Sequence, residues 1–290
     1  MPDNISDALE AAERARTTGD YALALRALDD ALTEGATFSE TLVAFVRLKA
    51  VCLVKLTQWS DLVPFCSQFI GPLRKYGVYH ALCEFHGYLG TALLRLGRYA
   101  ESEVHFRAAM HVAIWDVGDD SLALWHQRQL ALMYKNLGLW HQAAHECRAA
   151  LATAERKHVT DQLGVLRKNL AIILLKSGPV SDVQQLLDRA DSEVAATGKR
   201  HWSIRARLVR ARYLRMIGEH QDGLDVLSAI LPTTREGEYS REEAICLEYM
   251  GDCLLAEGRH KEALEHYEAA QKIAEVTAPQ GDLIPELGHR

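Results

Sequence analysis

Small and apolar residues recur along this chain with a period of about 40 residues. Seven short turns, most of them built on glycine, are each followed two positions later by an aromatic residue, a histidine or, once, a valine. Successive turns are 38, 40, 41, 40, 40 and 40 residues apart. They lie at Gly19-Asp20-Tyr21, Thr57-Gln58-Trp59, Gly97-Arg98-Tyr99, Gly138-Leu139-Trp140, Gly178-Pro179-Val180, Gly218-Glu219-His220 and Gly258-Arg259-His260. Such regular self-similarity predicts a repeat protein.

Small residues take fixed places around each turn. The residue seven positions before the turn is always alanine or glycine: Ala12, Ala50, Gly90, Ala131, Ala171, Ala211 and Gly251. Five positions after the turn the residue is again small, except for Leu62 and Val183, and four positions further on it is bulkier, as at Phe106 and Tyr267. Small residues let two helices approach closely, and bulkier ones fill the space between them. The pattern therefore predicts a helix-turn-helix repeat.

The spacing predicts a first helix before each turn, which we call the A helix, and a second helix after it, the B helix. The A helices are expected near residues 5–17, 39–56, 78–96, 119–137, 160–177, 200–217 and 238–257, which gives fourteen helices in all. Proline positions are assigned on the same layout. Pro179 should open a helix, Pro232 should follow one, Pro279 should break the last, and Pro64 should lie in the first turn of its helix.

The residues around the last turn, Gly258-x-His260-x₂-Ala263-x₃-Tyr267-x₂-Ala270, together with Leu89-Gly90, resemble the tetratricopeptide repeat (TPR). The usual TPR period is about 34 residues, and the longer repeat is similar to those of bacterial signalling regulators and kinesin light chains. The resemblance implies an all-α, right-handed superhelical solenoid of about seven TPR hairpins over residues 1–277. Residues 278–290 would begin an incomplete eighth repeat, so we expect a piece of a longer protein or a cap supplied by a partner.

Composition and charge narrow the function. The 290 residues are 48% hydrophobic, and 33 Lys and Arg against 39 Asp and Glu give a net charge of −6, which excludes a generally basic nucleic-acid coat. The charged N-terminus does not resemble a signal peptide, and no stretch of 18 apolar residues occurs. Six cysteines without a CxxC pair are expected to be buried in a reducing environment. We therefore expect a cytoplasmic protein with no membrane partner.

Sequence signatures of catalysis and metal binding do not occur. The chain has no GxxxxGK[ST], GxGxxG or GxSxG motif. His141 and His145 share a helix face, but Gln142 stands where a zinc protease needs glutamate. His80, Cys83 and His86 are spread around their helix and are read as packing residues. We expect no enzyme activity, no cofactor and no metal.

The resemblance implies a ligand site, because the A helices of TPR arrays line a concave groove. The implied positions are the second, fifth, ninth, twelfth and thirteenth when the turn glycine is counted as the fifteenth. Basic and amide residues at or beside them are Arg47, Lys55, Arg95, Arg128, Lys135, Asn136, Lys168, Asn169, Lys176, Arg205, Arg212 and Arg215. Acidic residues there are few: Glu13, Glu84, Glu248 and Asp252. The sequence thus predicts a basic groove on an acidic protein.

A basic groove favours an acidic peptide or protein segment as the ligand. We expect a non-enzymatic TPR scaffold that forms the sensory or interaction domain of a bacterial regulator, with a free-standing assembly adaptor as an alternative. Residues 199–215 contain seven Lys or Arg and no acid, and Arg205, Arg212 and Arg215 share one helix face. A phosphate backbone would also suit this segment, so a helical-repeat nucleic-acid-binding protein is a further, less favoured alternative. Self-association through the C-terminal end also stays open.

Overall fold

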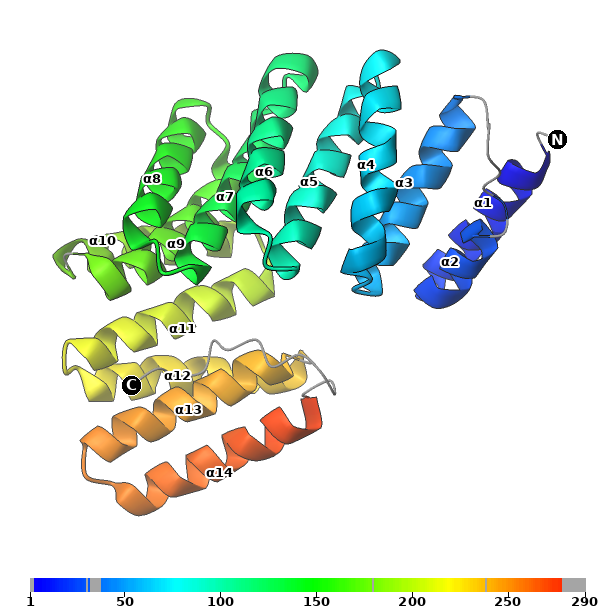
Figure 1. Ribbon diagram of the computed structural model, residues 1–290. Helices are drawn as coiled ribbons and strands as arrows, with labels where there is room; N and C mark the ends of the chain where they lie inside the picture. The colour runs from blue at the N-terminus through cyan, green and yellow to red at the C-terminus, as the bar shows by residue number, and fades with distance from the viewer. Residues whose placement is uncertain (1–2, 30, 32–37, 179, 238, 278–290) are drawn as a thin grey trace. The chain divides into compact units, whose positions relative to one another are not determined.

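The computed structural model describes residues 3–29, 31, 38–178, 180–237 and 239–277 (Figure 1). Over these ranges the regular structure is entirely helical, and none of the helices is long and apolar enough to cross a membrane. Backbone contacts divide the chain into two compact units, Met1–Leu139 and Trp140–Arg290, which we call unit 1 and unit 2.

Unit 1 consists of helices that pack in the order in which they occur along the chain. They are α1 (Asp3–Thr17), α2 (Tyr21–Asp29), α3 (Glu40–Lys55), α4 (Trp59–Lys75), α5 (Tyr79–Arg95), α6 (Tyr99–Val112), the π-helical turn η1 (Ala113–Val117) and α7 (Asp120–Asn136). Consecutive helices contact one another, and the A helices α1, α3 and α5 also contact one another in turn (Figure 1). Unit 1 is therefore a row of antiparallel hairpins in which the A helices α1, α3 and α5 lie side by side.

Unit 2 repeats this arrangement. Its helices are α8 (Trp140–Arg156), α9 (Thr160–Ser177), α10 (Ser181–Ala196), α11 (Arg200–Met216), α12 (His220–Glu236), α13 (Ser240–Ala256) and α14 (His260–Thr277). Consecutive helices pack together, and the A helices α9, α11 and α13 contact one another in turn. The predicted all-α hairpin array is confirmed over the described residues, with fourteen α-helices and every A-helix boundary within two residues of the prediction.

The predicted positions of two prolines are wrong. Pro64 lies beyond the first turn of α4, which begins at Trp59, and Pro232 lies inside α12 instead of following it. An internal proline removes one backbone hydrogen bond and costs about 3 kcal/mol. In each helix buried residues flank the proline, such as Phe65 and Ile230, and their packing holds the helix together across it. The predictions for Pro179 and Pro279 lie outside the described residues.

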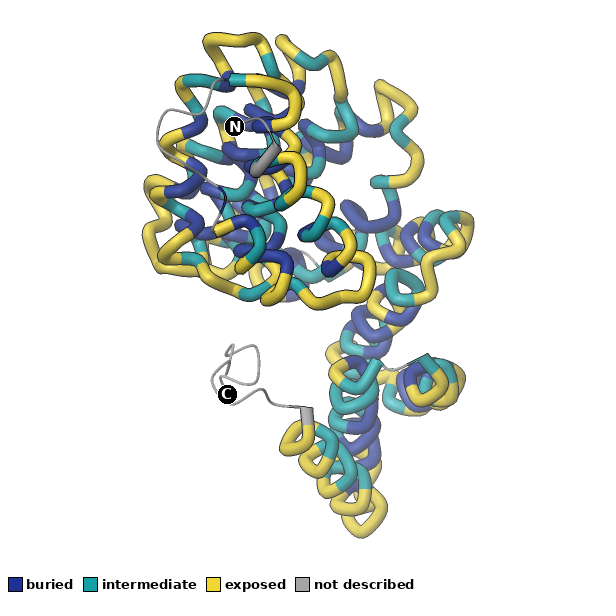
Figure 2. The backbone as a smooth tube through the Cα atoms, turned by 90° about the vertical axis from the view of Figure 1, so that its right-hand side faces the viewer, coloured by how far each residue is buried: buried dark blue, intermediate teal, exposed yellow. Residues whose placement is uncertain are grey.

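Close packing of the small residues is visible on both sides of the hairpin. Every small residue seven positions before a turn is buried. Figure 2 shows buried and exposed stretches alternating along the helices. A Cβ atom built on Gly90 would lie 2.7 Å from the ring of Phe106, and one on Gly251 would lie 2.7 Å from the ring of Tyr267. The two rings belong to the bulkier positions of the B helices. The small residue of the A helix therefore makes room for the bulkier residue of its own B helix.

The C-terminal helix α14 presents a largely polar outer surface. Its first turn buries Ala263 against the rest of unit 2. Leu264 and Val276 are its exposed large hydrophobic residues among those described. The predicted start of an eighth repeat, residues 278–290, lies outside the described residues.

Glycine-to-alanine substitutions test the packing register. Gly90→Ala should lower the free energy of unfolding by about 1–3 kcal/mol, because the new methyl group collides with Phe106. The collision must outweigh the gain of up to about 1 kcal/mol in helix propensity. Gly71→Ala in α4 is the control, since no atom outside its chain neighbours and its own helix backbone lies within 4 Å of its Cβ position; the only cost is that of a helical alanine before Pro72, so it should destabilise less than Gly90→Ala. Equal urea-unfolding curves for the two variants would contradict the register.

Candidate functional site

The predicted ligand-binding residues lie on the A helices of both units. Arg47, Lys55, Arg95, Arg128, Lys135 and Asn136 belong to unit 1, and Lys168, Asn169, Lys176, Arg205, Arg212 and Arg215 belong to unit 2. All of them are exposed or half-buried except Asn169, which is 4% exposed and lies among the packed helices of unit 2. We call the side of the A helices that carries the other eleven residues, taken in each unit by itself, the A-helix surface of that unit.

Two arginines of the A-helix surface bind carboxylates of the next A helix. In unit 1, Arg47 of α3 donates to both carboxylate oxygens of Glu84 on α5, at 2.7 Å from Nε and 2.6 Å from Nη2. In unit 2, Arg205 Nε of α11 donates to Glu242 Oε1 on α13 at 2.8 Å. Glu242 is only 8% exposed, so its carboxylate depends on this guanidinium for compensation.

A third pair lies at the other end of α11. Arg215 Nη1 donates to Asp252 Oδ2 on α13, and the hydroxyl of Tyr267 donates to Asp252 Oδ1 at 2.8 Å. The Arg215 guanidinium also lies 5.3 Å from the ring centre of Tyr249. Asp252 is thus held by the preceding A helix and by its own B helix at once.

The three pairs follow one rule. In each, the carboxylate comes 37 residues after the arginine, which is the 40-residue repeat less three positions. Three residues correspond to about one helical turn, or roughly 4.5 Å of rise. Neighbouring A helices therefore lie parallel with a constant offset, and residue i faces residue i+37.

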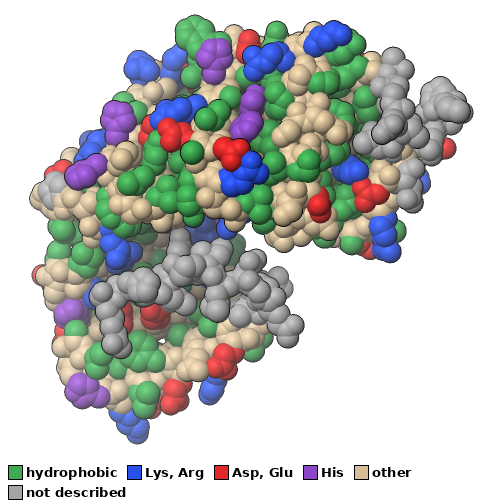
Figure 3. All heavy atoms as spheres, in the orientation of Figure 1, with side chains coloured by type: hydrophobic (Ala, Val, Ile, Leu, Met, Phe, Trp, Pro, Cys, Tyr) green, Lys and Arg blue, Asp and Glu red, His purple; other side chains and the backbone are tan. Residues whose placement is uncertain are grey.

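This rule changes the picture of a uniformly basic surface. Glu84 and Asp252, two of the few acidic residues that the sequence places at ligand-facing positions, are partners of arginines of the same surface. Figure 3 shows Lys and Arg side chains next to Asp and Glu on the face in view rather than one continuous basic area. These ion pairs were not predicted from the sequence, because each of them joins two different A helices.

The i+37 rule also identifies cations of the A helices that face no carboxylate of the next A helix. The residues 37 positions after Lys55, Lys176 and Arg212 are Ala92, Tyr213 and Tyr249, respectively. The ammonium of Lys55 lies 5.9 Å from the ring centre of Tyr21, and the guanidinium of Arg95 lies 6.0 Å from that of Trp59. Arg128, Lys135 and Lys168 make further interactions within the protein.

Positive charge gathers at the start of α11 in unit 2. The residue that faces Lys168 under the i+37 rule is Arg205, so two cations come together. The pKa of His201 is lowered by burial, by the charges of Arg205 and Lys199, and to a lesser degree by that of Lys168. Glu242 acts in the opposite direction and raises it. This part of the A-helix surface therefore keeps an excess of positive charge.

Two other arginines form ion pairs between A helices and neighbouring B helices, and these ion pairs were not predicted from the sequence. Arg167 of α9 is 6% exposed and donates to Glu155 of α8 at 2.7 Å and to Glu193 of α10 at 2.9 Å. Arg210 of α11 donates to two acids of α10, Asp188 and Asp191, at 2.8 and 2.6 Å. Both guanidinium groups are sheltered, with side chains 7% and 19% exposed, so these charged hydrogen bonds contribute to the packing of the repeats.

A cluster of histidines and a cysteine lies between α5, α6 and α7 in unit 1. The Nδ1 atoms of His86 and His105 are 3.0 Å apart, and Cys83 Sγ lies 3.3 Å from His126 Nε2. Burial, with the nearby charges of His105 and Arg74, lowers the pKa of His86 to about 4, and burial alone lowers that of His126 to about 4.

The geometry of this cluster favours packing. The predicted packing roles of Cys83 and His86 are confirmed by their burial, whereas the prediction for His80 is wrong, because His80 is exposed on its helix. His141 and His145 are also exposed. Within the described part of the chain, no three His, Cys, Asp or Glu side chains are arranged to hold a metal ion. All six cysteines are free thiols and buried, as expected.

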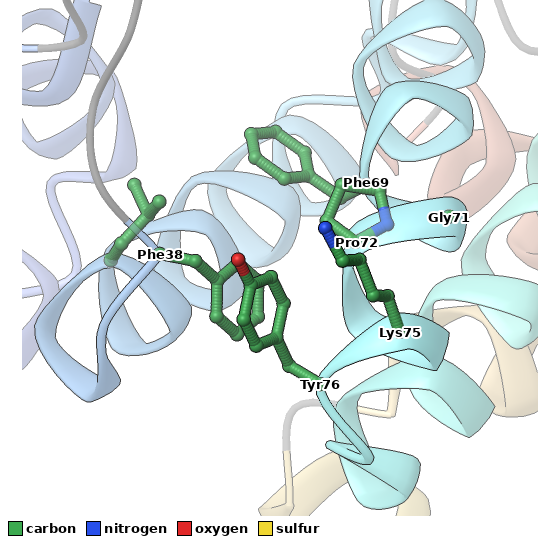
Figure 4. Close-up of a pocket in the computed structure, with 7 residues that line it drawn as sticks. Phe38, Phe69, Gly71, Pro72, Lys75 and Tyr76 are labelled. Carbon is green, nitrogen blue, oxygen red and sulfur yellow. The ribbon is translucent and has the colours of Figure 1, made fainter.

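A shallow pocket of about 590 Å³ lies between the start of α3 and the end of α4 (Figure 4). Its wall is formed by Phe38, Leu42, Phe69, Gly71, Pro72, Lys75 and Tyr76. The rings of Phe38 and Tyr76 stack with their centres 4.2 Å apart and 8° between their planes. Apart from Lys75 and the Tyr76 hydroxyl the wall is apolar, so the pocket offers room for an apolar side chain of a ligand.

No family model and no curated protein matches the sequence. Solved structures match the fold. The apo form of RapI is 11% identical, with a TM-score of 0.71 over 94% of this chain and 99% of that one. Aspartyl phosphate phosphatase F from Bacillus subtilis is 12% identical, with a TM-score of 0.67 over 96% and 70%. NprR in complex with its cognate peptide NprX is 13% identical, with a TM-score of 0.57 over 95% and 79%. The chain therefore has a TPR-like helical-repeat fold.

The buried histidines predict acid sensitivity of unit 1. Their folded pKa values of about 4 lie below the ordinary value of about 6.5, so the unfolded chain binds more protons. The stability is fully present above about pH 6.5 and is lost as the pH falls toward 4, by up to about 2 kcal/mol for each histidine at pH 5. Urea unfolding at pH 7, 6 and 5 measures this loss.

Two glutamine variants isolate the effect. His126→Gln removes one buried titrating group and should make the pH dependence shallower, even if it lowers the stability at pH 7. His141→Gln, which changes an exposed histidine, should leave the slope as in the wild type. The same slope in all three proteins would show that His126 does not titrate as its burial requires.

Proposed function

We propose that this protein is a non-enzymatic scaffold that binds a peptide or protein segment on its A-helix surface, as the sensory or interaction part of a bacterial regulator. The fold is similar to that of NprR, whose solved structure holds a cognate peptide. The observation that carries the proposal is the set of A-helix cations, such as Lys176 and Arg212, that face no carboxylate of the neighbouring A helix. A carboxylate of a ligand can pair with these cations.

The proposed ligand carries at least one carboxylate. Lys176 and Arg212 face no carboxylate of the neighbouring A helix under the i+37 rule. An exposed ion pair contributes only about 0.2–1 kcal/mol, and a sheltered charged hydrogen bond about 1.5–3 kcal/mol. Useful affinity therefore needs several contacts, which an extended segment along successive A helices supplies. Asn136 is exposed and suits a peptide backbone, whereas the buried Asn169 is left out of the proposed contacts.

A catalytic role is not proposed, although one protein of similar fold is named a phosphatase. All six cysteines and two of the histidines, His86 and His126, lie inside the helix packing. Burial raises the pKa of Cys83 to about 12 and lowers that of His126 to about 4, so the thiol stays protonated and the imidazole stays neutral near pH 7. Buried cysteines also suit the reducing cytosol that we propose as the setting.

The alternatives are less favoured. Three of the seven cations in residues 199–215 hold carboxylates of the chain, Arg205, Arg210 and Arg215, which leaves fewer for a phosphate backbone. A free-standing assembly adaptor would use the same surface. Self-association through the C-terminal end stays a prediction, and Leu264 and Val276 are the exposed large hydrophobic residues of α14 that such a contact would cover.

Peptide binding is tested with two pools of fluorescein-labelled nonapeptides that differ only in one Asp or one Asn at varied positions. Fluorescence anisotropy should show that the Asp pool binds at least about tenfold more tightly, since one sheltered ion pair of about 1.4 kcal/mol gives that ratio. Raising the salt concentration from about 0.05 to 0.5 M should narrow the difference by screening. Failure of both pools to bind at any salt concentration would contradict the proposed function.

A further inference from the structure

The face that α11 turns toward α13 bears three arginines at the same spacings as three residues of α13. Arg205, Arg212 and Arg215 are separated by seven and three residues, and Glu242, Tyr249 and Asp252 repeat these intervals 37 positions later. The first and third members form ion pairs. Because the helices are parallel and both ends of the row obey the same offset, the middle arginine faces the middle residue.

That middle residue is a tyrosine. Arg212 is half-buried, and among the described residues no carboxylate accepts a hydrogen bond from it or lies within ion-pair distance. The guanidinium of Arg215 lies 5.3 Å from the ring centre of Tyr249. Burial raises the pKa of the neighbouring Glu248, and the charge of Arg215 offsets part of this shift. The two carboxylates of the row, Glu242 and Asp252, are thus held by the outer two arginines.

We propose that Arg212 binds a carboxylate of the peptide ligand, as the specificity-determining residue of the A-helix surface in unit 2. The inference rests on the proposed function and sharpens it. A guanidinium holds a carboxylate through two parallel hydrogen bonds, and a half-buried one gains more from this than an exposed lysine does. Arg205 and Arg215 keep their own carboxylates and act as positioning residues on either side.

The same row limits how acidic the ligand is. Glu242 and Asp252 lie ten residues apart on α13, roughly 15 Å, and both flank the position that Arg212 faces. Glu242 and Asp252 already occupy Arg205 and Arg215, so further carboxylates of an acidic run would find no second open arginine in this row. The site therefore selects a segment with a single carboxylate at this point, from either an Asp or Glu side chain or a chain terminus.

The experiment compares variants of the full chain with the Asp and Asn nonapeptide pools, each made with a free and with an amidated C-terminus. Arg212→Gln should reduce the preference for the Asp pool from at least about tenfold to about twofold or less. Arg207→Gln, an exposed arginine of the same helix outside the row, is the matched control and should keep the wild-type preference. A third pool with four consecutive Asp residues should bind within about twofold of the single-Asp pool, because the other two arginines of the row hold Glu242 and Asp252.

The outcomes separate the inference from the function on which it rests. If Arg212→Gln keeps the full preference for the Asp pool while the wild type binds it, the inference is wrong and the scaffold function stands. If the wild type binds no pool, the proposed function itself fails. If the wild type binds both pools equally and amidation of the C-terminus weakens both, the bound carboxylate is that of the chain terminus. Should Arg212→Gln fold poorly in a urea titration, Arg212→Lys must still weaken binding, because it keeps the charge but loses the paired hydrogen bonds.

Discussion

Close approach of helices at small residues is the constraint on which the rest of the structure depends. Wherever an alanine or glycine sits seven positions before the turn, the B helix can place a bulky ring directly over it, as Phe106 does over Gly90. That contact fixes how each hairpin closes, and the nearly constant period fixes how hairpins follow one another. Side-by-side A helices then have one offset, and residue i faces residue i+37.

The offset decides which charges are used inside the protein. At three places an arginine of one A helix is followed 37 residues later by an acid of the next, and the two form an ion pair. These pairs stabilise the packing of the A helices. Where the facing residue is Ala92, Tyr213 or Tyr249, the cation on the preceding helix faces no acid. Whether a cation of an A helix binds the next helix or is open to a ligand therefore depends on whether the residue 37 positions later is an acid.

The sequence alone predicts the hairpins, because turns and small residues are local patterns with a visible period. It misses the helices that continue through Pro64 and Pro232, since the packing of flanking residues outweighs a local cost. It also misses the pairing of Arg47 with Glu84. Their separation of 37 residues is the 40-residue period less one helical turn, but the sequence alone does not show how far neighbouring A helices are shifted along their axes. The contact between His86 and His105 depends on ring orientations of two helices, and no sequence spacing reports these.

A double-mutant cycle between Arg212 and Tyr249 tests the i+37 rule most directly, because it adds an acid at the one position of the row that lacks it. The free energy of unfolding is measured for the wild type, Arg212→Gln, Tyr249→Glu and the double variant, with Tyr249→Gln as the uncharged control. The rule predicts a favourable coupling of about 0.5–1.5 kcal/mol between arginine and the introduced acid, and none with the control. Additive effects in the charged cycle would mean that the two positions do not face each other, and the account would fail.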